Sequence, residues 1–430
     1  MATGVPTTKT KTKKVSLSYD GKAAEGDILS SRDVSIKTIH ESESNNRLYF
    51  GDNYDILHAL LQDSSLRGMV KLIYIDPPFS TMGSFLSRKQ NHAYSDNLSG
   101  ATYIEFLRKR LILLRELLSE DGSIYLHLDE NMIFEMKIIM DEIFGVANYK
   151  NLIIRKKCNP KNYTRKKYGN IVDYILFYTK TDEYIWNKPT TPLSPKSLKE
   201  YRYVEQETGR NFMKVPIHAP GVRNGETGQP WRGMVPPLGK HWQYPPQTLD
   251  EMDRKGEIFW SKNGNPRRKV YIDQHLGVGI QDIWLDFKDA HNQNIKITGY
   301  PTEKNPELLE RIIRTSSNEG DIVLDCFAGS GTTLAVAGQF KRNWIGIDDS
   351  PEAIETIINR FYKGLKPMGD YVNKETALEF SLFDNMETVI SNSDKNSCLE
   401  NFALFTSESN WEELLSNHCL IFETLLSNKP

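Results

Sequence analysis

The sequence predicts an α/β fold, a doubly wound mixed sheet that carries an inserted module. First, an apolar strand-like run at residues 70–75 stops abruptly at two prolines. Second, a helix pattern and then a strand pattern occupy residues 102–128. Third, a glycine-rich loop near residue 330 lies between another strand pattern and another helix pattern. Strands that alternate with helices in this way form parallel sheets.

The N-terminal residues 1–45 are rich in Lys, Thr, Ser and Asp and poor in apolar residues. Such a composition buries too little surface to order a chain, so a disordered basic arm is expected. Order is expected to begin at the short strand pattern of residues 47–50. A turn at Gly51-Asp52-Asn53 then leads into a helix with apolar positions at helical spacing.

The apolar run of residues 70–75 predicts a buried parallel strand. It ends at the tetrapeptide Asp76-Pro77-Pro78-Phe79, because proline cannot continue a ladder of hydrogen bonds. An amphipathic helix over residues 102–118 and a strand over residues 123–128 follow. The tetrapeptide is therefore placed at the C-terminal end of a strand.

Two further strands are expected at residues 152–155 and 171–178, where they could pair as an antiparallel hairpin at the sheet edge. From about residue 181 to 290 the chain is rich in Pro, Gly, Trp and Tyr and has little periodicity. This region is interpreted as an irregular inserted module, which Trp284 is expected to anchor to the rest of the protein.

Regular patterns return with a helix at residues 306–316, a strand at 321–324 and a strand at 344–347 that ends in Asp348. The glycine loop lies between the two strands, and Pro351 suits the first turn of a last helix. The predicted organisation is an arm (1–45), a first part of an α/β domain (46–180), an insert (181–295), a second part of the same domain (296–365) and an acidic extension with helical stretches (366–430).

Charge is distributed unevenly, although the net charge is only −2. Residues 366–430 hold 4 basic and 11 acidic residues, whereas residues 150–167 include basic residues but no acidic residue. The basic run predicts contact with phosphates, although a mobile surface loop would also explain it. The nucleic-acid contacts predicted from the basic run and from the insert are Lys156, Lys157, Lys161, Arg165, Lys166, Arg267 and Arg268.

The four cysteines are widely scattered, which favours a reducing compartment and argues against a zinc site. No apolar signal core begins the chain, and no apolar run approaches the length of a membrane span. A cytoplasmic protein without a structural metal is expected.

The glycine loop from Asp325 to Thr333 suits a nucleotide-like ligand, because small residues let backbone amides approach it. Leu334 stands where a dinucleotide-binding fingerprint would need glycine, and no Gly-Lys-Ser/Thr ending of a phosphate-binding loop is present. Asp348 could accept hydrogen bonds from ribose hydroxyls. A purely structural turn is the alternative.

The tetrapeptide suits a chemistry in which an aromatic amino nitrogen must become nucleophilic. The Asp76 carboxylate and the Pro77 carbonyl can accept the two N–H bonds, and the Phe79 ring can stack on the base. Pro77 and Pro78 hold the backbone rigid. An ordinary proline-terminated strand is the alternative for the tetrapeptide alone, and His127 is expected to be a packed core or cleft residue.

Together the two motifs resemble the amino-methyltransferase family that modifies adenine or cytosine in DNA, in its β-type order with the tetrapeptide before the cofactor loop. The resemblance covers residues 47–180 and 297–363, and residues 73–80 are similar to modification subunits of type III restriction systems. It implies a circularly permuted, Rossmann-like methyltransferase fold in which Asp76, Pro77, Pro78 and Phe79 are catalytic. Asp in first place is commoner in the adenine enzymes, whereas the cytosine enzymes usually carry Ser.

The resemblance further implies S-adenosylmethionine as cofactor. The cofactor-binding residues that it implies are Asp52, Pro301, Thr302, Asp325, Phe327, Ala328, Gly329, Ser330, Gly331, Thr332 and Asp348. The segment at residues 299–304 departs from the family, which usually has His where this chain has Tyr300 and Pro where it has Asn305.

The implied partners are double-stranded DNA bound by base flipping, a second copy of the chain and a cognate restriction enzyme, with the insert as target-recognition module. Methyl transfer would be an in-line displacement. Two alternatives stay open: methylation of the cytosine amino group, and an inactive DNA-binding subunit that keeps the fold.

Overall fold

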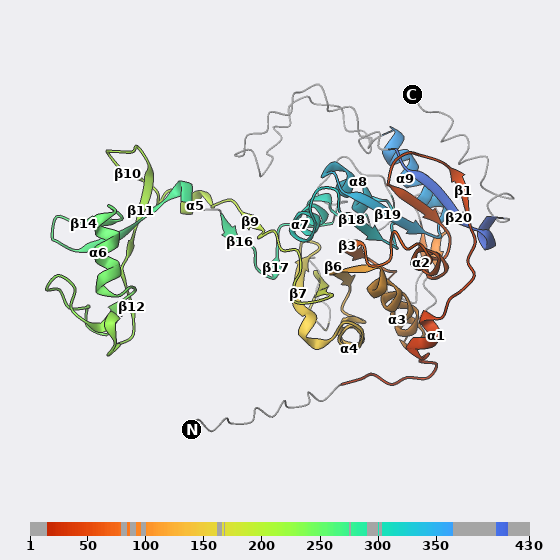
Figure 1. The fold of residues 1–430 in the computed structure, drawn as a ribbon, viewed down its shortest axis with the longest axis horizontal. Helices are drawn as coiled ribbons and strands as arrows, with labels where there is room; N and C mark the ends of the chain where they lie inside the picture. The colour runs from red at the N-terminus through yellow and green to blue at the C-terminus, as the bar shows by residue number, and fades with distance from the viewer. Residues whose placement is uncertain are drawn as a thin grey trace. The chain divides into compact units, whose positions relative to one another are not determined.

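The computed structural model describes residues 15–78, 84–86, 92–95, 100–160, 166, 168–274, 277–289, 300, 303–363 and 401–411. These residues form two compact units. Unit 2 comprises Thr190–Ile280, and the other described residues belong to unit 1. Figure 1 shows the elements of both units by their labels.

Unit 1 is built on a 10-stranded sheet with the order β1-β20-β2-β19-β18-β3-β6-β8-β7-β17. The strands from β20 to β6 in this order are parallel, whereas β8 pairs antiparallel with both β6 and β7. The predicted doubly wound mixed sheet is thus confirmed. The strands are β1 (Ile36–His40), β2 (Arg47–Phe50), β3 (Val70–Ile75), β6 (Leu118–Leu128), β7 (Tyr149–Lys156), β8 (Val172–Thr179), β17 (Ile283–Trp284), β18 (Ile322–Asp325), β19 (Asn343–Asp348) and β20 (Ala403–Ser407).

Helices cover both faces of this sheet (Figure 1). One layer contains α2, α3 and α4, whose apolar residues share one core cluster with the sheet. On the other face Tyr125 contacts Ser316 of α7, and Trp344 stacks on Phe361 of α9. The helices of unit 1 are α1 (Glu25–Leu29), α2 (Asn53–Gln62), α3 (Gly100–Leu117), α4 (Ile133–Phe144), η1 (Val146–Asn148), α7 (Pro306–Ser316), α8 (Thr332–Gln339) and α9 (Pro351–Lys363).

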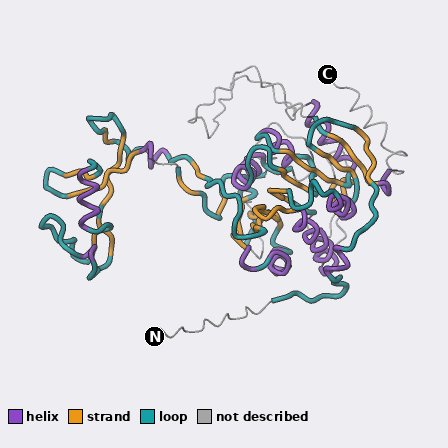
Figure 2. The backbone as a smooth tube through the Cα atoms, viewed as in Figure 1, coloured by secondary structure: helices purple, strands orange, loops and turns teal. Residues whose placement is uncertain are grey.

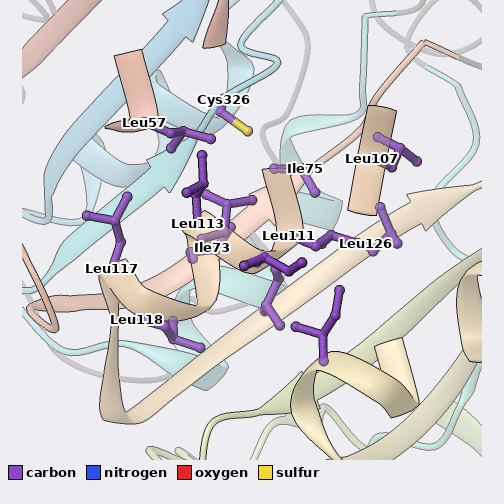
Figure 3. Packing of buried hydrophobic residues seen from close by; sticks show 14 of the residues in the cluster. Leu57, Ile73, Ile75, Leu107, Leu111, Leu113, Leu117, Leu118, Leu126 and Cys326 are labelled. Atoms are coloured by element: carbon purple, nitrogen blue, oxygen red, sulfur yellow. The ribbon is translucent and has the colours of Figure 1, made fainter. Parts of the chain in front are cut away.

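The period of two along each strand decides which side chains meet which layer. Ile73 and Ile75 of β3 point into the cluster formed with α2 and α3 (Figure 3). The intervening Tyr74 points to the opposite face. α3 ends at Leu117 and β6 begins at Leu118, and β6 pairs with β3, whose C-terminal end carries Asp76.

The N-terminal arm and the acidic extension differ from expectation. Residues 15–45 are ordered: Ile28 of α1 packs in the core, and β1 pairs with β20. Long-range contacts that composition does not reveal hold this segment, among them a 2.6 Å hydrogen bond from the Tyr19 hydroxyl to Glu105. The extension supplies β20, which lies between β1 and β2, and residues 408–411 directly after it are helical. Residues 1–14 lie outside the described part.

Unit 2 contains a four-stranded sheet with the order β10-β11-β15-β14. Loops make up much of this segment (Figure 2). Trp231, Trp242 and Leu249 are the centre of its small core. The elements are β9 (Thr190–Thr191), α5 (Pro195–Leu198), β10 (Tyr203–Val204), β11 (Asn211–Pro216), β12 (His218–Pro220), η2 (Glu226–Gly228), β13 (Lys240–Trp242), α6 (Pro246–Arg254), β14 (Ile258–Trp260), β15 (Pro266–Tyr271), η3 (Ile272–Gln274) and β16 (Val278–Gly279).

Unit 2 lies within the region predicted as an insert, 181–295, and is narrower than that prediction. The segment from residue 281 belongs to unit 1, where β17 pairs with β7 and Trp284 is buried. Outside both sheets described above, β4 (Ser84–Leu86) pairs with β5 (His92–Ser95). Among the described residues, every helix is too short or too polar to cross a lipid bilayer.

Candidate active site

A cleft of about 250 Å³ opens at the C-terminal ends of β3, β18 and β19, which are neighbours in the sheet of unit 1. This is where ligands bind in open α/β sheets. The cleft brings together the tetrapeptide and the glycine loop, which are about 250 residues apart in the sequence. The predicted residues that line it are Asp76, Pro77, Pro78, Asp325, Phe327, Ala328, Gly329, Ser330, Thr332 and Asp348.

Other predicted residues lie elsewhere or are not described. Phe79, Pro301 and Thr302 lie outside the described residues. Asp52 and Gly331 are absent from the lining of the cleft, although both adjoin residues that line it. Asn53, from the predicted turn Gly51-Asp52-Asn53, lines the cleft at the start of α2. Sequence reasoning missed the lining residues contributed by α3, which no motif marks: Phe106 and Arg110.

The glycine loop needs its glycines for two physical reasons. Gly329 and Gly331 have φ angles of +51° and +72°, a conformation that is costly for other residues. A Cβ on Gly331 would also lie 2.7 Å from Cγ1 of Ile357. Gly331 is the residue before α8, so it lets the chain turn directly into that helix.

Asp348 supports the glycine loop from the end of β19. Its Oδ2 accepts a 2.7 Å hydrogen bond from the Gly329 amide, and its Oδ1 accepts a 3.0 Å bond from the Ser350 amide. Burial, together with the negative charge of Asp349, raises the pKa of Asp348 to about 7. The carboxyl therefore changes charge near neutral pH.

Asp325 occupies the equivalent place at the end of β18. Its Oδ1 accepts a 3.0 Å hydrogen bond from the Phe327 amide. Burial raises the pKa of Asp325 to about 7, and the charge of Asp76 adds to this effect. The two carboxyls give the cleft an acidic floor whose charge depends on pH.

Asp52, Asn53 and Arg110 connect α2 and α3 to this floor. Asp52 accepts a 2.7 Å bond from the Tyr54 amide as the N-cap of α2, and it lies 3.2 Å from Nη2 of Arg110. Arg110 Nε donates to the side chain of Asn53, whose Nδ2 donates to the Cys326 carbonyl at 2.6 Å. Asn53 and Arg110, rather than Asp52, face the cleft.

Asp76 follows the last residue of β3, and its two carboxylate oxygens have different surroundings. Lys304 Nζ lies 2.7 Å from Oδ2. Oδ1 is buried and has no hydrogen-bond partner among the described residues. A buried acceptor without a partner is costly, so this atom indicates a place where a ligand with a hydrogen-bond donor would fit.

His127 lies directly behind Asp76 and is fully buried. Its Nδ1 is 3.9 Å from Oδ1 of Asp76 and 2.8 Å from the hydroxyl of Tyr74. The apolar strand pattern around His127 correctly placed it in the interior, but no sequence signal indicated its proximity to Asp76.

The predicted nucleic-acid contacts are dispersed. Lys156 ends β7 and Lys157 follows it, both half-buried, and Lys166 is exposed. Lys161 and Arg165 lie outside the described residues. Arg267 and Arg268 are adjacent on β15 of unit 2, where Arg267 is exposed and Arg268 donates a 2.6 Å bond to the Tyr244 hydroxyl. Among the described residues, no cluster of His, Cys, Asp and Glu suits a metal ion.

Comparison with known proteins agrees with this geometry. A family model described as DNA methylase, of the N6/N4 type, matches residues 70–360. The chain is 44% identical over 412 residues to the type II methyltransferase M.EcaI of Enterobacter cloacae, covering 93% of this chain and 90% of that protein.

More distant relatives cover less of their length. The StyLTI Mod subunit of a type III restriction-modification enzyme of Salmonella typhimurium is 27% identical over 70% of this chain and 51% of its own length. The type II methyltransferase M.KpnI of Klebsiella pneumoniae is 28% identical over 67% of this chain and 76% of its own length. Because the family model spans well over half of the chain, this protein belongs to the DNA methylase family and is a DNA methyltransferase.

Proposed function

We propose that this protein transfers a methyl group from S-adenosylmethionine to the exocyclic amino group of adenine in double-stranded DNA. The observation that carries the proposal is Oδ1 of Asp76, a buried acceptor without a partner among the described residues, in the cleft that the glycine loop also lines. An amino group that donates an N–H bond would satisfy this oxygen.

Asp76 acts by drawing electron density toward the amino nitrogen. The lone pair of an aromatic amine is delocalised into the ring, and a carboxylate that accepts an N–H bond localises it on the nitrogen. Lys304 holds the other oxygen of Asp76, which fixes the direction of Oδ1 before the base arrives. The Pro77 carbonyl is the proposed acceptor for the second N–H bond, and Phe79 is the proposed stacking group.

The lining of the cleft fits S-adenosylmethionine, which carries a sulfonium, an ammonium group and ribose hydroxyls. Asp325, Asp348 and Asp349 supply carboxyls, and Phe106 and Phe327 supply aromatic surface. Asp348 is the proposed partner of the ribose hydroxyls. When bound, S-adenosylmethionine supplies an electrophilic methyl group in line with the amino nitrogen.

Adenine is proposed over cytosine because Asp, rather than Ser, begins the tetrapeptide. Methylation of the cytosine amino group is the second candidate, since the family is of the N6/N4 type. An inactive DNA-binding subunit is disfavoured because the cleft keeps both the carboxylate and the glycine loop.

The sheet of unit 2 supports the proposal of a DNA contact, because its two faces differ. Cross-strand pairing places Tyr203, Lys214, Phe259 and Arg267 on one face, which we call the outer face. Lys214 Nζ lies 3.5 Å from the ring centroids of both Tyr203 and Phe259. Basic and aromatic side chains in this combination suit phosphates and bases.

The opposite face of this sheet packs against the small core of unit 2 through Ile258 and Trp260. Arg268 shares this inner face with Ile258, its cross-strand partner. Arg267 is therefore the better candidate for a DNA contact, although the sequence predicted both arginines equally.

The proposal also covers how the base enters the site and which partners the protein has. A base inside a duplex cannot reach the half-buried Asp76, so the target adenine must flip out of the helix. M.EcaI is named as a type II methyltransferase, and the StyLTI subunit as part of a type III restriction-modification enzyme. We therefore propose a cognate restriction enzyme and a cytoplasmic location for this chain, and a homodimer as its assembly.

The experiment compares Asp76→Ala and Asp76→Asn with the unchanged protein on DNA from a methylation-free host. DNA digested to nucleosides should contain N6-methyladenine, and both variants should lose at least about 10²-fold in rate while still binding S-adenosylmethionine. N4-methylcytosine in its place would establish the second candidate. Robust methylation by Asp76→Ala would overturn the assignment of the site.

A further inference from the structure

A chain of polar side chains runs from Asp76 toward the edge of the unit 1 sheet. The Tyr74 hydroxyl lies 2.8 Å from His127 Nδ1, and His127 Nε2 lies 3.1 Å from Oδ2 of Asp173. Arg155 Nη1 lies 3.0 Å from the same oxygen of Asp173. His127 and Arg155 have no exposed side-chain surface, so their charges interact without intervening bulk water.

Arg155 is held in place at the far end of this series of polar side chains. Its Nη2 lies 2.8 Å from Asp289, and its Nε donates a 2.8 Å bond to the Phe287 carbonyl. Three contacts therefore hold one guanidinium in place, and it in turn holds the carboxylate of Asp173. Asp173 cannot turn away from His127 without breaking its ion pair with Arg155.

These neighbours decide which nitrogen of His127 carries a proton. Burial favours the neutral carboxyl of Asp173, but the contact with His127 and the charges of Arg155 and Lys304 outweigh it and hold the pKa of Asp173 below its usual range. A carboxylate only accepts, so the proton belongs on Nε2, although its direction falls short of a well-aligned hydrogen bond. Burial, with the charge of Asp76, raises the pKa of Tyr74, which therefore keeps its proton and donates it to Nδ1.

Neutral His127 thus has one basic nitrogen, Nδ1, and this atom faces the catalytic carboxylate. Nδ1 and Oδ1 of Asp76 are 3.9 Å apart. A shift of about 1 Å would bring them within hydrogen-bond distance. Asp76 needs such a neighbour, because an amino nitrogen that gains a methyl group must lose a proton.

We propose that His127, held by Asp173 and Arg155, accepts the proton that Asp76 takes up during methyl transfer. As the nitrogen–methyl bond forms and the methyl–sulfur bond breaks, the amino nitrogen loses one proton to Oδ1 of Asp76. The Tyr74 hydroxyl turns its O–H away from Nδ1 of His127, that nitrogen accepts the proton, and Asp173 stabilises the imidazolium. A buried carboxylate that orients an imidazole and stabilises its cation is a well-established arrangement in enzymes. The inference rests on the proposed role of Asp76.

The charged groups around His127 set the pH dependence that this role predicts. Tyr74 and Asp76 face the ring from β3 and Asp173 faces it from β8, with Arg155 and Lys304 one contact further. Only neutral His127 can accept a proton, so the single-turnover rate should rise with pH, and this rise should depend on His127. Removal of the charge on Asp173 destabilises the imidazolium and should move the midpoint to lower pH.

The test measures single-turnover methylation against pH for the full chain and four variants. His127→Asn and His127→Gln should lower the rate by about 10- to 100-fold and abolish this rise with pH. Asp173→Asn should move the midpoint down by about one pH unit. Asp289→Asn is the matched control, because it also removes a carboxylate from Arg155 but does not contact His127; its midpoint should move much less.

Two further measurements separate a relay from a structural role. Nitrogen NMR shifts of His127 in the cofactor-free protein should show the Nε2–H tautomer, and Asp173→Asn should lose this preference. Affinities for S-adenosylmethionine and DNA should stay within about twofold. Unchanged pH profiles in both His127 variants and in Asp173→Asn would overturn the proposal, even if Asp76→Ala is inactive; an active Asp76→Ala would instead overturn the proposed function beneath it.

Discussion

The cleft of unit 1 and the outer face of the unit 2 sheet both present charges from strands, but in opposite ways. In the cleft, Asp76 pairs with Lys304, and Arg155 pairs with Asp173 behind it. On the outer face, Lys269 pairs with Glu205, whereas Lys214 and Arg267 lie beyond ion-pair distance of every carboxylate among the described residues. Paired, buried charges fix atoms in place for chemistry, whereas unpaired, exposed cations attract a polyanion from a distance.

This difference predicts which measurement each region controls. Changes in the cleft should alter the rate of methyl transfer or the binding of cofactor. Changes on the outer face should alter DNA affinity and its dependence on salt, and leave the chemical step unchanged.

The largest effect is expected at Lys304. Lys304→Met leaves the carboxylate of Asp76 without its 2.7 Å partner, so Oδ1 is no longer held toward the target amino group. Single-turnover methylation should fall on the order of 10²-fold, with DNA affinity nearly unchanged. Lys304→Arg should restore part of the rate.

Lys341→Met is the matched control for this change, because it removes an exposed lysine whose ion-pair partner among the described residues is Glu319. Its rate should equal that of the unchanged protein. An equal loss in both variants, or a Lys304→Met protein that loses DNA affinity instead of rate, would contradict the division between the two regions.

The second effect concerns the glycine loop. Gly331→Ala places a Cβ 2.7 Å from Ile357 at a φ of +72°, so the loop or α9 must shift. The free energy of unfolding should fall by about 1–3 kcal/mol, and affinity for S-adenosylmethionine should fall about tenfold. Gly320 has a similar φ of +84° but no neighbour within 4 Å of an added Cβ. Calorimetry of Gly320→Ala should therefore show a lower free energy of unfolding from backbone strain alone, with unchanged affinity for S-adenosylmethionine.

These two motifs were predictable from the sequence because each is a local signal. Prolines after an apolar strand place Asp76 at a strand end, and glycines between a strand and a helix place the loop. The contacts that complete the site join distant positions: Lys304 meets Asp76, and Tyr74 meets His127. The resemblance placed the segment of residues 299–304 at the cofactor pocket, but no spacing rule connects such distant residues, so these contacts were not predicted.

The antiparallel pairing of β7 with β8 near one end of the sheet was predicted correctly. The β1–β20 end of the sheet and the outer face were missed for a related reason. β20 pairs with β2 across more than 350 residues, and its surroundings in the sequence are acidic and polar. In unit 2 the strands have two to six residues, which is too short for a reliable alternation of polar and apolar positions. Arg267 and Arg268 therefore looked alike until cross-strand register separated them.

The third effect is a pH dependence of cofactor binding. Because the pKa of Asp325 and of Asp348 is raised to about 7, both carboxyls are largely protonated at pH 6 and ionised at pH 8. An ionised carboxylate binds cationic and hydroxyl donors better. Below pH 7, affinity for S-adenosylmethionine should therefore rise with pH, by up to about tenfold per pH unit for each carboxyl that must lose its proton. Calorimetric titration of each Asp→Asn variant should show a flatter dependence; an affinity that falls with pH would contradict the assignment.

The smallest effect at low salt, and the sharpest test of the comparison, concerns the two adjacent arginines of β15. Arg267 is on the outer face, so Arg267→Ala should weaken DNA binding a few-fold and reduce the slope of log affinity against log salt by about 0.9, as expected for one lost phosphate contact. Arg268 bonds to Tyr244 on the inner face, so Arg268→Ala should lower the unfolding temperature and keep the salt slope.

Binding measured between about 50 and 200 mM salt separates these outcomes, since a structural defect shifts affinity equally at every salt concentration whereas a lost ion contact changes the slope. Single-turnover rates at saturating DNA should match in both variants, because neither arginine lines the cleft. If Arg268→Ala changed the slope and Arg267→Ala did not, the inner face would be the one that meets DNA. The assignment of methyl transfer to the cleft and of DNA attraction to the outer face would then be wrong.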